Sequence, residues 1–239
     1  AGNNALTHID RSGNLKVLLE RPGAGGTHFL PDGSILVIGQ IGLRRIYPDG
    51  RVALLADGKE FGAGNDITMG RHGEIYFTVP SKGIYRLTPG KEGRLELVID
   101  KGANGLEVDP RGTYLFVARK SVERYRIYGT DKPLGDAQEI YTFPEGEGGG
   151  DGCTFDMWGN FYTVRFKTGV IRVISPQERD LIAEIPTGVV PSSNLTFSGP
   201  RNIQLFVTAG APKMENCQVL IADLDVVGFC GHVGATEYP

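Results

Sequence analysis

Side chains that can donate oxygen ligands stand just ahead of short apolar runs along this chain. The residues are Asn65, Asn104, Asp151 and Asn194, and Thr27 opens a similar segment nearer the start. Their spacings are 38, 39, 47 and 43 residues. Amide, carboxylate and hydroxyl oxygens with few formal charges suit a hard cation such as Ca²⁺. We call these five residues the openers, because each begins one of the apolar segments. If the fold brings the openers together, we expect one divalent-cation site.

Each opener begins the same strand-turn-strand pattern, which is the basis of the fold prediction. Gly-, Pro- and Asp-rich clusters separate two apolar runs and have the chemistry of hairpin turns. These clusters are residues 31–33, 71–73, 109–112, 156–159 and 198–201. Two more strand-like runs follow each complete hairpin, such as residues 43–47 and 52–55. Four antiparallel strands in about 40–50 residues are typical of a β-propeller blade.

The ends of the chain decide the predicted number of blades. Residues 5–10 and 15–20 read as the two outer strands of a blade whose inner strands do not precede them. We therefore predict an all-β, six-bladed propeller, residues 1–239 as one domain, with the first blade incomplete in this chain. A five-bladed ring is the alternative. A parallel β-solenoid would need shorter and stricter repeats.

In a propeller the first strand of every blade faces the axis, so equivalent positions in successive blades converge. The openers should therefore meet at one end of that axis. A single Asn or Asp at a strand start needs no function, because its side chain can bond the local backbone. The recurrence of Asn or Asp in successive repeats favours a site. The glycine-rich residues 145–150, directly before Asp151, are expected to form a loop at its mouth.

Composition limits the partners of the protein. The net charge is −3 and the Lys and Arg residues are scattered, so we expect no nucleic-acid partner. No apolar run approaches the ~20 residues that would span a bilayer, so we expect no membrane partner. Cys217 and Cys230 could pair, although free thiols are favoured. The partner that we expect is therefore a small-molecule substrate. The chain could be a monomer or a dimer, and a soluble protein either in the cytoplasm or exported with its signal removed.

The openers, taken in order, carry a family resemblance. Four segments resemble the gluconolactonase / senescence marker protein (regucalcin) / luciferin-regenerating enzyme family over about Thr27 to Val227. The segments are Asn65-Asp66-Ile67, Asn104-Gly105-Leu106, Asp151-Gly152-Cys153 and Asn194-Leu195-Thr196-Phe197. The resemblance implies a six-bladed propeller with one divalent metal. It also implies metal ligation at Asn104 and Asp151, a general-base role for Asp151, and substrate or water-mediated metal contact at Asn65.

Two family features have no counterpart in this sequence. The metal-binding Glu of the family lies on a first inner strand that would precede Ala1. An Arg that several members carry two residues before the Asn matching Asn65 is replaced by Ala63, whose side chain cannot hydrogen-bond a sugar hydroxyl.

We therefore expect a metal-dependent hydrolase that opens a lactone, either a sugar lactone or a related ester ring. Asp151 would be catalytic, Asn65, Asn104 and Asp151 would bind the metal, and Asn65, Asn194 and Thr27 would contact substrate. Ca²⁺ is the expected metal, with Mg²⁺, Mn²⁺ or Zn²⁺ as alternatives. Two other functions remain open: a non-catalytic propeller that binds a ligand or partner around a structural metal, and a specialised enzyme acting on a secondary metabolite.

Overall fold

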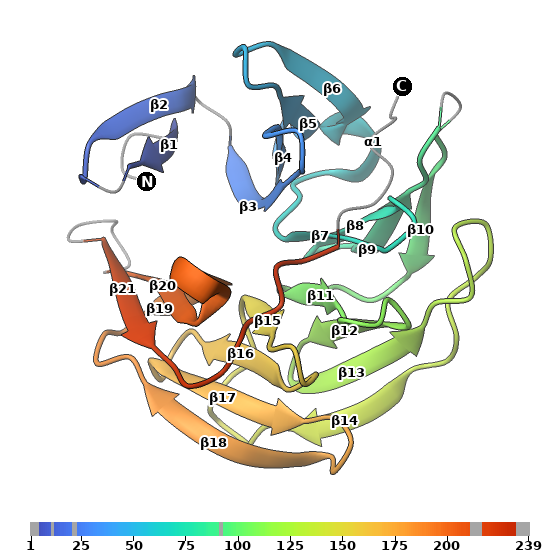
Figure 1. Ribbon diagram of the computed structural model, residues 1–239. Coiled ribbons are helices and arrows are strands. Elements are labelled where there is room, and N and C mark those ends of the chain that lie inside the picture. Colours follow the sequence, from blue (N-terminus) through green and yellow to red (C-terminus); the bar gives the residue numbers. More distant parts are fainter. Residues whose placement is uncertain (1–4, 11, 21–22, 91–92, 211–216, 233–239) are drawn as a thin grey trace.

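The computed structural model describes residues 5–10, 12–20, 23–90, 93–210 and 217–232. Within them, sheets are arranged around one axis, and the all-β propeller is confirmed (Figure 1). A four-residue helix, α1 (Gly58–Phe61), and a short 3-10 turn, η1 (Pro200–Asn202), are the helical elements of this part of the chain. No described helix has the length and apolarity to cross a membrane.

Each blade is one antiparallel sheet whose strands follow in sequence order. The first blade contains β3 (Ala24–Phe29), β4 (Ile35–Gly39), β5 (Gly42–Ile46) and β6 (Val52–Asp57). The second contains β7 (Ile67–Met69), β8 (Ile75–Val79), β9 (Gly83–Leu87) and β10 (Leu95–Ile99). The third contains β11 (Leu106–Val108), β12 (Tyr114–Ala118), β13 (Ser121–Arg126) and β14 (Gln138–Thr142). The fourth contains β15 (Cys153–Phe155), β16 (Phe161–Arg165), β17 (Val170–Ser175) and β18 (Asp180–Pro186). The fifth contains β19 (Ser192–Ser198), β20 (Gln204–Ala209) and β21 (Gln218–Asp223).

The blade count in the described residues corresponds to the five-bladed alternative. Five sheets have three or four strands. Strands β1 (Ala5–Ile9) and β2 (Leu15–Glu20), predicted as the outer strands of an incomplete blade, pair only with each other. Figure 1 shows this two-stranded sheet between the first and fifth blades.

Neighbouring blades are held face to face by apolar clusters. Leu36 and Leu43 of the first blade pack in one cluster with Met69 and Phe77 of the second, and all four are fully buried. Similar clusters lie between the second and third, third and fourth, and fourth and fifth blades. The first strands β7, β11, β15 and β19 each contribute to one of these clusters, which holds the residues that precede them close to the axis.

The segment after β21 crosses the turns that join the first two strands of the blades. The amide of Met157 donates to the carbonyl of Val227 (2.8 Å), and the amide of Phe229 donates to the carbonyl of Phe155 (2.9 Å). Figure 1 shows this segment passing across the axis. We call this the turn end of the propeller, and the opposite end, where the openers lie, the opener end.

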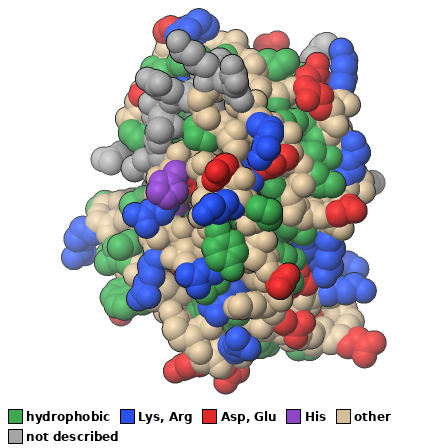
Figure 2. Space-filling model, turned by 90° about the vertical axis from the view of Figure 1, so that its right-hand side faces the viewer, with side chains coloured by type: hydrophobic (Ala, Val, Ile, Leu, Met, Phe, Trp, Pro, Cys, Tyr) green, Lys and Arg blue, Asp and Glu red, His purple; other side chains and the backbone are tan. Residues whose placement is uncertain are grey.

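Charged side chains on the outer surface have no sign bias on the face that Figure 2 shows, where Lys and Arg alternate with Asp and Glu. This agrees with the scattered basic residues of the sequence. Cys217 and Cys230 do not form a disulfide with each other, as expected, and both are exposed, whereas Cys153 is buried.

Candidate functional site

Hairpin register places Asn65, Asn104 and Asp151 at one level of the propeller. In the second, third and fourth blades the first paired residues are Ile67, Leu106 and Cys153. Each of the three openers stands two residues before its paired residue. The openers also begin the ladder in the same way: the amide of Asn65 donates to the carbonyl of Thr78 (2.8 Å), and that of Asp151 to Val164 (2.9 Å). Equivalent levels on adjacent inner strands bring the three residues to the opener end, and Asn104 and Asp151, but not Asn65, line one cavity there.

The other two openers lie at different levels, which corrects the sequence alignment. Thr27 pairs with Val37 and stands at the level of Ile67, and it is exposed. Asn194 pairs with Thr208 and stands one residue further along than Asp151 does in its own blade. Both strands have irregular register at this point, β3 between Ala24 and Thr27 and β19 between Ser192 and Asn194. In each strand the residues between the irregularity and the hairpin turn are regularly paired, so the levels of Thr27 and Asn194 follow from their distance to the turn.

Asn194 instead shares its level with Asp66 and with glycines in the other inner strands. A side-chain carbon on Gly152 would lie 2.1 Å from Oδ1 of Asn194, and one on Gly26 would lie 2.6 Å from Oδ1 of Asp66. The glycines therefore leave the space that the two polar side chains occupy. The side chain of Asn194 lies near the Asp66 carboxylate and lowers its pKa. Asp66 accepts hydrogen bonds from the amides of Ile67 (3.0 Å) and Leu106 (3.3 Å).

Three carboxyl groups around the axis have raised pKa values. Burial raises the pKa of Asp66 to about 6. Burial, and then the nearby Asp66 carboxylate, raises the pKa of Asp151 to about 7. Burial raises the pKa of Glu107 to about 8, although Thr68 donates a hydrogen bond to this carboxylate. Ion pairs found among the described residues include none of these three carboxylates. Sequence reasoning missed Asp66 and Glu107 as members of this cluster.

Asn104 and Asp151 line one cavity of about 390 Å³ at the opener end, between the third and fourth blades. Phe166 and Lys167 form one wall. The loop Gly148–Gly150 forms another, as expected for the glycine-rich segment. This loop is anchored at both ends: Nη2 of the buried Arg165 donates to the carbonyl of Gly148 (2.8 Å), and the amide of Gly150 donates to the carbonyl of Arg119 (2.8 Å).

The donor set fits a hard divalent cation better than a tetrahedral zinc ion. Asp151 and Asn104 supply carboxylate and amide oxygens to one cavity, and Asp66 adds negative charge nearby. Within the described ranges, no three His, Cys, Asp or Glu side chains form a group that could hold a metal. A cation here would therefore depend on amide oxygens, which suit Ca²⁺, Mg²⁺ or Mn²⁺. Its charge would offset the repulsion between Asp66 and Asp151.

Comparison with known proteins gives one family match and a curated relative. A family model described as SMP-30/Gluconolactonase/LRE-like region matches residues 2–211. A gluconolactonase of Zymomonas mobilis is 28% identical over 224 residues, covering 79% of this chain. The match spans 61% of that relative, so this chain covers less than two thirds of its length.

Solved structures share the fold at low sequence identity. A calcium-binding protein, regucalcin, of Agrobacterium tumefaciens has a TM-score of 0.83 at 18% identity, over 98% of this chain and 87% of the other. A gluconolactonase of Xanthomonas campestris has a TM-score of 0.77 at 22% identity, over 93% and 79%. A luciferin-regenerating enzyme has a TM-score of 0.81 at 17% identity, over 98% and 89%. These similarities support the propeller itself.

Proposed function

Because this chain belongs to the SMP-30/gluconolactonase/LRE-like family, we propose that it is a metal-dependent hydrolase that opens a lactone ring. The family resemblance inferred from the openers is confirmed by this match. One observation carries the proposed site: Asp151, with a pKa of about 7, lines the same cavity as Asn104. A carboxyl group with such a pKa, in a cavity, is a candidate for proton transfer near neutral pH.

The proposed metal ligands are Asn104 and Asp151, with Asn65 either a third ligand or the holder of a ligand water. The common register of the three openers supports this set. Ca²⁺ is the expected ion, with Mg²⁺, Mn²⁺ or Zn²⁺ as alternatives. When bound, such an ion would supply Lewis-acid polarisation of the lactone carbonyl.

Asp151 is the proposed general base. Its carboxylate would accept a proton from the water that attacks the lactone carbonyl, and would later return the proton to the leaving ring oxygen. The anchored loop Gly148–Gly150 stands directly before Asp151 and helps to fix its position at the cavity. Thus the chain supplies a positioned base and amide groups that leave much of the cation's charge uncompensated.

Substrate contacts are proposed for Asn65 first. Asn194 lies near Asp66 and lowers the pKa of that carboxyl group, so its proposed effect on substrate is indirect. Thr27 is exposed and stands two residues further from the opener end than Asn65 does in its own blade. Its proposed contact would therefore require a substrate that extends past Asn65, Asn104 and Asp151. Phe166 and Lys167 on the cavity wall offer an apolar surface and a positive charge to the rest of the substrate.

The test is a lactone panel, beginning with glucono-δ-lactone, assayed by acid release with each of the four cations. Asp151→Asn should lose cation binding by calorimetry and at least about 100-fold of the hydrolysis rate, the usual minimum for removing a general base. Asp136→Asn, which changes an exposed loop carboxylate, is the matched control and should retain both. Wild-type turnover in Asp151→Asn would disprove the role of Asp151. No hydrolysis of any lactone by the wild type would disprove the proposed function.

A further inference from the structure

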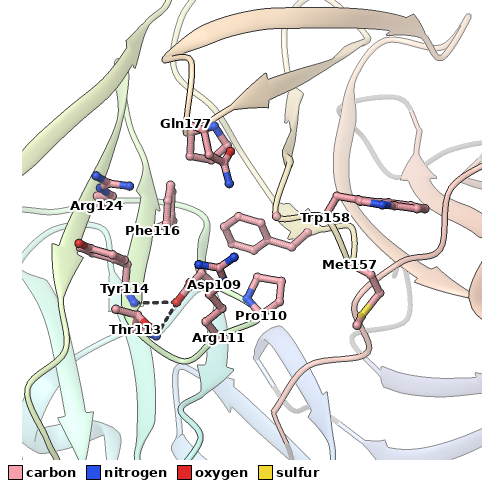
Figure 3. A pocket seen from close by; sticks show the side chains of 13 residues that line it. Asp109, Pro110, Arg111, Thr113, Tyr114, Phe116, Arg124, Met157, Trp158 and Gln177 are labelled. Carbon is pink, nitrogen blue, oxygen red and sulfur yellow. Dashed lines mark hydrogen bonds between the residues drawn. The ribbon is translucent and has the colours of Figure 1, made fainter.

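A second cavity, of about 250 Å³, lies between the same two blades but at the turn end (Figure 3). The β11–β12 turn, residues 109–113, bounds one side, and the β15–β16 turn, residues 157–159, bounds another. Gln177, in the turn after β17, completes the rim. The proposed hydrolysis uses the opposite ends of β11 and β15, so nothing assigned so far explains this cavity.

Its floor and rim are aromatic. Phe116 and Phe155 are buried beneath it and pack edge to face, with ring centroids 5.0 Å apart. Trp158 on the rim is 59% exposed, and Met157 beside it is 54% exposed. A flat apolar molecule would cover these side chains and gain the free energy of their burial.

Two arginines give the cavity a positive side. The guanidinium of Arg124 lies over the ring of Tyr114, 4.4 Å from its centroid, and its Nε donates to Gln138 (3.0 Å). Arg111 is exposed in the β11–β12 turn, and Figure 3 shows it in the middle of the cavity, between Tyr114 and Trp158. Stacking on an aromatic ring leaves the outer N–H groups of a guanidinium available to an anion.

Neither guanidinium is neutralised by a carboxylate in the part of the chain that the structure describes. Arg86, Arg119 and Arg172 each form an ion pair with Glu, and Arg111 and Arg124 form none. Asp109 lies in the same turn, but one of its oxygens accepts from the amides of Thr113 and Tyr114, both at 2.6 Å. That oxygen serves the turn, and with the Asp109 charge counted the two arginines still leave the cavity lining with one net positive charge for a ligand.

We propose that this cavity binds a small aromatic carboxylate. The ring would lie against Trp158 above the Phe116–Phe155 pair, and the carboxylate would receive N–H donors from Arg111 and Arg124. A planar guanidinium matches a carboxylate with two parallel hydrogen bonds, which gives strength and orientation together. The volume lies just below the usual 300–1,000 Å³ of drug-sized pockets, so one or two fused rings fit.

The intact chain offers a specific probe, because Trp158 is the single tryptophan of the sequence. Naphthalene-2-carboxylate should quench its emission saturably and release heat in calorimetry. The neutral naphthalene-2-carboxamide should bind at least about tenfold more weakly, since bonds between charged partners are the stronger ones. Arg111→Gln and Arg124→Gln should each weaken carboxylate binding by about tenfold.

Arg126→Gln is the matched control, because Arg126 lies on the same strand, over the ring of Tyr128, and does not line the cavity. It should bind the carboxylate as the wild type does. Three results would each overturn the proposal. The wild type could bind the two naphthalene probes with equal affinity or give no saturable signal, or Arg124→Gln and Arg126→Gln could lose equal affinity for the carboxylate. Thermal melting checks that the variants are folded, and unchanged lactone hydrolysis in them would show that the two cavities act separately.

Discussion

The side chain of Asn194 lies near the carboxylate of Asp66 and lowers its pKa against the effect of burial. Asp66 precedes β7 in the second blade and Asn194 lies on β19 in the fifth, with the third and fourth blades between them in the ring (Figure 1). The two residues belong to blades whose inner strands do not pair with each other. The polar side chain of Asn194 partly offsets the burial that raises the pKa of Asp66 to about 6.

Asn194→Ala should lower the free energy of unfolding by about 0.5–1.5 kcal/mol, because the buried Asp66 carboxyl group loses a polar neighbour but keeps the amides of Ile67 and Leu106. Urea unfolding measures this directly. Thr196→Ala, at an exposed position of the same strand, is the control and should change stability by less than about 0.5 kcal/mol. Equal stability of the two variants would mean that the Asn194 side chain beside Asp66 contributes nothing measurable.

The sequence could predict the strands and three of the openers for one reason. Turn chemistry at residues such as Gly73 and Gly159 marks each hairpin, and both glycines have positive φ. Counting back from a hairpin turn then places Asn65 and Asp151 at one level. Thr27 stands six residues before the turn residue Gly33, where Asn65 and Asp151 stand eight before theirs, so the same counting separates it from the set. For Asn194 the count has no equivalent turn glycine to start from, because the β19–β20 connection contains η1.

The carboxylate cluster could not be predicted because it depends on neighbours from other blades. Asp66 reaches the axis since the equivalent positions in neighbouring strands hold glycine, such as Gly26. Glu107 is recognisable only once Thr68 of the preceding blade is known to donate to it. The sequence signal that was available is the acidic second residue of the segment Asn65-Asp66-Ile67.

Gly105→Ala should displace the proposed catalytic residue without touching its side chain. A side-chain carbon at Gly105 would lie 2.1 Å from the carbonyl oxygen of Asp151 and 3.2 Å from Sγ of Cys153. Backbone must therefore move, at a cost of about 1–3 kcal/mol in stability. A shift of Asp151 by about 1 Å could reduce kcat/KM for a hydrolysed lactone by about 100-fold.

Gly50→Ala is the control for this substitution, because the space around Gly50 is open and only its positive φ of 87° would cause strain. We expect it to cost about 1–2 kcal/mol in stability and to leave lactone hydrolysis unchanged. Wild-type kcat/KM in Gly105→Ala would show that the position of Asp151 does not depend on this close approach of β11 and β15.

Glu107 should make the stability of the cation-free protein depend on pH. Burial raises its pKa from the ordinary value of 4.5 to about 8, against hydrogen bonds from Thr68 and from the amide of Val108. The folded state therefore holds this proton more tightly than the unfolded state does. Stability from this group is complete below about pH 4.5 and is lost as the pH rises through about 8.

Glu107→Gln removes that titration. In a buffer with a chelator, its free energy of unfolding should fall less than that of the wild type between about pH 5 and about pH 9, and the difference should reach a few kcal/mol at the upper end. Glu178→Gln, which changes an exposed turn residue, should follow the wild-type curve. The remaining slope in Glu107→Gln belongs to other groups, including Asp66 and Asp151. An identical slope in Glu107→Gln and wild type would show that the Glu107 proton is held no more tightly in the folded protein than in the unfolded chain.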